Sequence, residues 1–108
     1  MSTTKELRIA TGVLRRSLKE LSMYRTEVEE GAAKLSALAS DHNDYKQTAQ
    51  VLGESRTMVS NTADRIDVAV KELQRCLSVS LYSDSEDDVT EAKALIDKAQ
   101  QQSRNSAS

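Results

Sequence analysis

Positively charged side chains gather near the start of the sequence, at spacings that place them along one side of a helix. Positions 5, 8, 12, 15 and 19 follow a 3-4-3-4 spacing, with one further arginine beside them. We call this set the basic face, and it comprises Lys5, Arg8, Gly12, Arg15, Arg16 and Lys19. Like charges three or four residues apart cost an isolated helix about 0.2–0.5 kcal/mol per pair. No compensation is evident in the sequence, so the face is either solvated or a docking surface for an acidic protein.

Gly12 and several aliphatic side chains could belong to the same surface. Glycine inside a helix costs up to about 1 kcal/mol relative to alanine. Gly12 therefore indicates a close approach, either by a binding partner or by another helix. The aliphatic residues off or beside the main apolar stripes are Ile9, Val13, Met23, Val51 and Met58. They are either part of a mixed protein-binding surface or edge residues of the core.

The sequence contains no motif that indicates catalysis or metal binding. His42, the single histidine, is expected in an exposed loop, and Cys76, the single cysteine, is expected to be a small buried thiol. No Cys/His cluster has metal-ligand spacing, and no glycine-rich phosphate motif occurs. The acidic run Asp84–Asp88 lacks the glycine and ligand spacing of a calcium loop, and helix capping explains it. We expect no enzyme activity, no catalytic residue, no cofactor and no metal.

The composition favours long helices in one domain. The 108 residues include no proline, no phenylalanine, no tryptophan and three glycines, which suits uninterrupted helices with an aliphatic core. A net charge of −2 argues against nucleic acid as a partner. The longest run without a charge is the eight residues Cys76–Ser83, whereas a membrane span needs about 20. No signal peptide, myristoyl anchor or membrane partner is expected.

Three apolar stripes predict three helices. The first recurs every seven residues from Leu7 to Leu35 and, after a capping box at its start, predicts a helix over about 4–39. The second recurs from Tyr45 to Leu73 and predicts a helix over about 43–81 with a face wide enough to contact two helices. A shorter stripe predicts a third helix over about 86–102, capped at Ser85, with a polar C-terminal tail after it. Its residues are Val89, Ala92, Ile96 and Ala99.

These elements predict an all-α fold, an elongated left-handed three-helix bundle that forms one domain over 1–108. Two long helices joined by a short polar loop must run antiparallel, and the third packs back across one end. A parallel or antiparallel homodimer of long helices would also satisfy the heptads. The wide face of the second helix and the third stripe favour the bundle within one chain.

Several motifs resemble one known family. The segment LRIATGVLRRSLKELSMYRTE, residues 7–27, resembles the first helix of the tubulin-binding cofactor A family. The second helix matches at Lys46, Ala49, Leu52, Glu54-Ser55-Arg56 and Met58-Val59, and the later motifs are LQR at 73–75 and EAKALID at 91–97. Two positions depart from the family pattern. Gln47 replaces a second lysine, which weakens a basic patch at Lys46, and Ser60 replaces a frequent proline, so the second helix should be straighter.

The resemblance implies a non-enzymatic cochaperone that captures β-tubulin released from the cytosolic chaperonin and holds it before the αβ-heterodimer assembles. It implies a cytoplasmic, cytoskeleton-associated monomer that meets other tubulin-folding cofactors only indirectly. The residues expected to contact β-tubulin are Arg8, Gly12, Arg15, Arg16, Lys19, Met23, Lys46, Glu54, Arg56 and Met58. The alternative is a SNARE-like helical module in membrane traffic, because polar residues also lie within the heptad seam.

Overall fold

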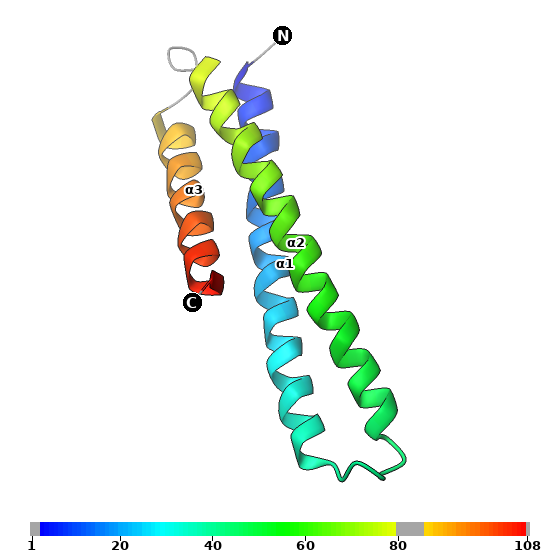
Figure 1. The fold of residues 1–108 in the computed structure, drawn as a ribbon. Coiled ribbons are helices and arrows are strands. Elements are labelled where there is room, and N and C mark those ends of the chain that lie inside the picture. The colour runs from blue at the N-terminus through cyan, green and yellow to red at the C-terminus, as the bar shows by residue number, and fades with distance from the viewer. Residues whose placement is uncertain (1–2, 80–85, 108) are drawn as a thin grey trace.

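The described part of the chain is a bundle of three α-helices. The structure is a computed structural model, and it describes residues 3–79 and 86–107. The helices are α1 (Thr3–Ala37), α2 (Tyr45–Val79) and α3 (Glu86–Ala107). Figure 1 shows α1 and α2 running antiparallel along the whole molecule, with α3 beside one half of them. The predicted all-α fold is confirmed, and no strand forms within the two described ranges.

The connection between α1 and α2 is longer than predicted. α1 ends at Ala37, two residues before its expected end, and α2 begins at Tyr45, two residues after its expected start. The connection forms turns of its own: the backbone N–H of His42 donates to the carbonyl of Ala39 at 2.9 Å, and that of Tyr45 to the carbonyl of His42 at 3.1 Å. These bonds satisfy backbone groups that further helical turns would otherwise use. The expected last residues of the second helix, 80–81, lie outside the described ranges.

Asp44 caps the start of α2. Its carbonyl oxygen accepts the first helical hydrogen bond, from the N–H of Thr48 at 2.9 Å. Its own N–H donates to Nδ1 of His42 at 3.0 Å. His42 is exposed in the loop, as predicted, and its ring contributes to the turn that starts the helix.

α3 is longer than predicted. A helix was expected over 86–102 with a polar tail after it, but α3 continues to Ala107. The added residues, 103–107, include no glycine or proline, the two residues that most disfavour a helix. The first turn carries the predicted acidic residues, Glu86–Asp88, where the helix dipole favours negative charge. The predicted N-cap, Ser85, lies outside the described residues.

The core lies where all three helices meet. Its buried cluster consists of Leu7, Ala10, Leu14, Leu18, Leu21, Ile66, Ala69, Leu73, Cys76, Ala92, Ile96 and Ala99. Thr62 is fully buried in the same region, and its hydroxyl accepts a hydrogen bond from Nη2 of Arg65 at 3.0 Å. We call this part, formed by residues 3–25, 62–79 and 86–107, the three-helix half.

The rest of the molecule, residues 26–61, consists of α1 and α2 alone with their connection, and we call it the two-helix half (Figure 1). Leu52 is the one hydrophobic side chain of this half that is buried, while Val28, Leu35 and Leu38 are partly buried. The molecule measures 63 × 27 × 18 Å, so it is a rod as predicted. A large part of its length has no third helix over the hairpin.

Candidate functional site

Two arginines of the basic face are paired within the chain. Nε of Arg8 lies 3.0 Å from a carboxylate oxygen of Asp88, and Arg15 pairs with Glu91. Both carboxylates belong to α3, which packs along this edge of α1. The interpretation that the charges of the basic face lack compensation is therefore wrong for Arg8 and Arg15.

Arg16 and Lys19 differ from these two arginines. Both side chains are exposed, and neither forms an ion pair with another residue in the described ranges. Their positive charges are therefore available to an acidic partner.

Gly12 is not a point of helix–helix contact. A Cβ built on Gly12 would lie 3.4 Å from Nη1 of Arg16, whose side chain lies over the glycine, and no other helix comes within 4 Å. The interpretation of Gly12 as a contact between helices is therefore wrong. The hairpin uses Gly31 in that way, because a Cβ there would lie 3.3 Å from Cδ1 of Leu52 across the α1–α2 seam. Approach of a partner to Gly12 stays a prediction.

The other predicted contact residues do not gather in one place. Met23 is exposed on α1, and Met58 is partly buried on α2. Glu54 and Arg56 are both exposed, but residues two apart lie on different sides of a helix. Lys46 lies in the first turn of α2, at the opposite end of the rod from the basic face (Figure 1). The ten predicted residues thus form no single continuous surface, and their role in binding stays a prediction.

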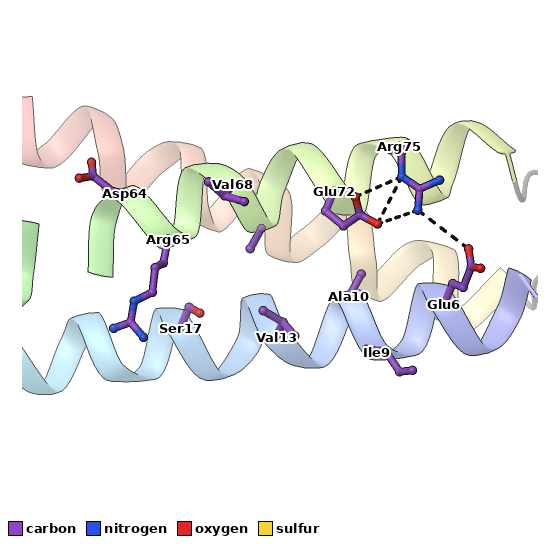
Figure 2. Close-up of a pocket in the computed structure, with 11 residues that line it drawn as sticks. Glu6, Ile9, Ala10, Val13, Ser17, Asp64, Arg65, Val68, Glu72 and Arg75 are labelled. Carbon is purple, nitrogen blue, oxygen red and sulfur yellow. Dashed lines mark hydrogen bonds and ion pairs between the residues drawn. The ribbon is translucent and has the colours of Figure 1, made fainter. Parts of the chain in front are cut away.

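An apolar groove of about 790 Å³ runs between α1 and α2. In Figure 2 the groove faces the viewer, and α3 lies behind α1 and α2. The groove is lined by Glu6, Ile9, Ala10, Val13, Ser17, Asp64, Arg65, Val68, Ala69, Glu72 and Arg75. Ile9, Val13 and Val68 are exposed by 58%, 39% and 68%. Sequence reasoning singled out the first two and missed Val68, although an aliphatic residue outside the heptad stripe of α2 is the same signal.

Ion pairs flank the apolar part of the groove, and two of them, Arg75–Glu6 and Arg65–Glu20, join α1 and α2. At one end Nη2 of Arg75 lies 2.6 Å from Glu72 and 3.9 Å from Glu6 (Figure 2). At the other end Nη2 of Arg65 lies 3.4 Å from a carboxylate oxygen of Glu20. The hydrogen bond from Arg75 holds the pKa of Glu72 below its ordinary value, and Glu72 in turn raises the pKa of Arg75.

Cys76 is the buried thiol that the sequence predicts. It is only 1% exposed, and burial raises the pKa of the thiol, which disfavours the reactive thiolate. Groups of three or more acidic, histidine or cysteine side chains that could hold a metal do not occur in the described parts of the chain. Within the same residues, no helix is long and apolar enough to cross a membrane.

Comparisons with known proteins agree with the fold and the motifs. The family model described as "Tubulin binding cofactor A" matches residues 2–96. The "Tubulin-folding cofactor A" of Arabidopsis thaliana is 33% identical over 107 residues, which cover 94% of this chain and 95% of the relative. The "Tubulin-specific chaperone A" of Homo sapiens is 32% identical over 96 residues, which cover 86% of this chain and 89% of the relative.

A solved structure extends the agreement to three dimensions. The crystal structure of tubulin folding cofactor A from Arabidopsis thaliana superimposes with a TM-score of 0.82 at 32% identity. The match covers 92% of this chain and 96% of the solved chain. Family model, relatives and fold agree over nearly the whole length, so this chain belongs to the tubulin-binding cofactor A family, whose members are chaperone cofactors and not enzymes.

Proposed function

We propose that this protein is a tubulin-folding cochaperone that captures β-tubulin after its release from the cytosolic chaperonin and holds it until the αβ-heterodimer assembles. The printed names of the relatives, "Tubulin-folding cofactor A" and "Tubulin-specific chaperone A", support a tubulin client. In this proposal the protein acts as a cytoplasmic, cytoskeleton-associated monomer. It binds neither nucleic acid nor membrane, and it meets the other folding cofactors through its client.

The observation that carries the proposal is the presence of two unpaired cations, Arg16 and Lys19, within the basic face. Arg16 and Lys19 are exposed and form no ion pair with any other described residue, although α3 provides carboxylates to their neighbours Arg8 and Arg15. Such charges are favourable where an acidic partner surface faces them. They steer the encounter between the two proteins and raise the association rate.

Holding a folding client requires release as well as capture. Exposed charge pairs contribute little to lasting affinity, typically less than about 1 kcal/mol each. Most of the durable affinity must therefore come from apolar contacts beside the charges, which mainly slow dissociation. A mixed surface of this kind gives rapid capture and moderate affinity, as a reversible holding step needs.

The test is a pull-down of β-tubulin from cytosolic extract with the tagged protein and with charge-reversal variants. Arg16→Glu with Lys19→Glu removes the unpaired cations and leaves the Arg15–Glu91 pair intact. The matched control reverses Lys93 and Lys98, two exposed lysines of α3, with the same change in net charge. We expect the α1 variant to lose β-tubulin severalfold, with unchanged helicity by circular dichroism, and the α3 variant to bind as the wild type does.

The bound proteins, identified by mass spectrometry, separate this function from others. Enrichment of β-tubulin over α-tubulin is the expected result. Equal recovery of both chains would indicate binding of the assembled heterodimer and would contradict the holding role. Recovery of vesicle or coiled-coil proteins without tubulin would favour the helical module in membrane traffic.

A further inference from the structure

In the three-helix half, one side of the α1–α2 hairpin is covered by another helix and the other side is open. One side is covered by α3, whose Ala92, Ile96 and Ala99 belong to the buried core. The other side carries the apolar groove, whose lining residues all come from α1 and α2 (Figure 2). α1 and α2 thus form an apolar surface on each side of the hairpin, and α3 covers only one of these two surfaces.

The open groove has the form of a seat for a helix. The small, buried side chains of Ala10 and Ala69 line it and allow a close approach, while Val13 lines it from α1 and Val68 from α2. The lining on α1 spans twelve residues, from Glu6 to Ser17, which corresponds to about three helical turns or about 17 Å. Exposed aliphatic side chains that share one concave surface indicate a site for another apolar surface.

The charges along the rims indicate which helix would fit. Arg16 follows Ile9 by seven residues and Val13 by three, so it lies on the same side of α1. Asp64 lines the groove from α2. Neither charge is paired with another residue in the described ranges. A bound helix with carboxylates beside α1 and a cation beside α2 would pair with both Arg16 and Asp64.

The contact between α3 and the hairpin is an example of an amphipathic helix held by apolar packing and by ion pairs with α1. Its apolar stripe packs on the hairpin, while Asp88 and Glu91 beside that stripe pair with Arg8 and Arg15 of α1. The contact therefore combines aliphatic packing with carboxylates facing α1 arginines. Arg16, with Ile9 and Val13, presents the same combination on the side of α1 that borders the groove.

We infer that the groove lined by Ile9, Val13 and Val68 binds one amphipathic helix of the β-tubulin client. The helix has an aliphatic stripe about three turns long and acidic residues on the edge beside α1, and it adds a fourth helix to the three-helix half. This inference rests on the proposed function and adds the site and the kind of client segment. Binding by the groove also explains how apolar contact accompanies the steering charge of Arg16.

The experiment places a charge in the groove and the same charge elsewhere on α2. Val68→Glu alters the groove, and Val51→Glu is the matched control, because Val51 is a similarly exposed valine of α2 in the two-helix half. Both sites are exposed, so both variants should fold, and circular dichroism checks this. Val68→Ser serves as a milder second variant. We expect Val68→Glu to reduce captured β-tubulin more than about tenfold and Val51→Glu less than about twofold.

A photo-crosslinking residue at position 68 identifies the occupant. A crosslink to an acidic amphipathic helix of β-tubulin, with none from position 51, supports the inference. If Val68→Glu and Val68→Ser capture β-tubulin as the wild type does, the groove is not the site, although the proposed function stands. If the wild type captures no β-tubulin, the proposed function and the inference both fail. A crosslink between two copies of this chain, with a dimer mass by light scattering that Val68→Glu abolishes, would assign the groove to self-association and overturn the inference.

Discussion

The three-helix half and the two-helix half contain the same two helices, yet they differ in how completely those helices are buried. Leu7, Leu14 and Leu73 are fully buried where α3 completes the bundle. Leu35, in the corresponding heptad stripe of the two-helix half, is only partly buried. A helix with a wide apolar face needs two neighbours to cover it, and a hairpin supplies one. The two-helix half should therefore contribute less to stability and open more easily.

The largest expected effect comes from truncating a leucine in each half. Leu14→Ala leaves a cavity in the core and should lower the free energy of unfolding by about 2–5 kcal/mol. Leu35→Ala removes a side chain that solvent already reaches, and a loss of about 1 kcal/mol is expected. Urea denaturation followed by circular dichroism measures both. Equal losses would show that the two halves are packed equally well.

Hydrogen exchange measures the same difference residue by residue. Backbone amides of residues 26–37 and 46–60 should exchange through local opening, whereas those of 7–21 and 66–77 should approach the protection set by global unfolding. Native-state exchange detected by NMR gives the opening free energy of each amide. Uniform protection along α1 and α2 would contradict the expectation that the two-helix half opens more easily than the three-helix half.

The sequence predicts the helices of both halves, but it does not predict how completely each half is buried. The heptads of Leu7–Leu35 and Tyr45–Leu73 have the period of a helix, so helix number, order and approximate bounds followed from local pattern. The same period continues into the two-helix half, because a stripe records which residues face a neighbour and not how many neighbours there are. Burial there could not be derived until the length and position of α3 were known.

The candidate site shows the same limit. Arg8, Arg15 and Arg16 are equivalent in sequence, but α3 lies along one edge of α1 and pairs with the first two. The carboxylates that do so are about 80 residues away in the chain, so no local rule predicts the pairing. The groove likewise depends on which side of the hairpin α3 covers, so the sequence could not show that Ile9, Val13 and Val68 line one surface.

Glycine replacements should strengthen the two-helix half by smaller amounts. Gly53 has no atom within 4 Å of where a Cβ would lie, so Gly53→Ala should stabilise α2 by up to about 1 kcal/mol. At Gly31 the new Cβ would lie 3.3 Å from Cδ1 of Leu52, and that side chain must shift slightly. Gly31→Ala should therefore gain less than Gly53→Ala. Thermal denaturation of both variants tests the order, and a larger gain at Gly31 would show that the seam is looser than its contacts indicate.

The smallest expected effect concerns the ion pairs at the end of the three-helix half. Arg75 holds the pKa of Glu72 below its ordinary value in the folded protein. A carboxylate with a lowered folded pKa stabilises the fold above its unfolded pKa, and this stability is lost as the pH falls through the folded pKa. Glu72→Gln should therefore lower the thermal midpoint slightly at neutral pH, and the difference from the wild type should vanish in acid. The group is exposed, so added salt should also reduce the difference at neutral pH. A difference that persists in acid would mean that Glu72 acts through packing and not through its charge.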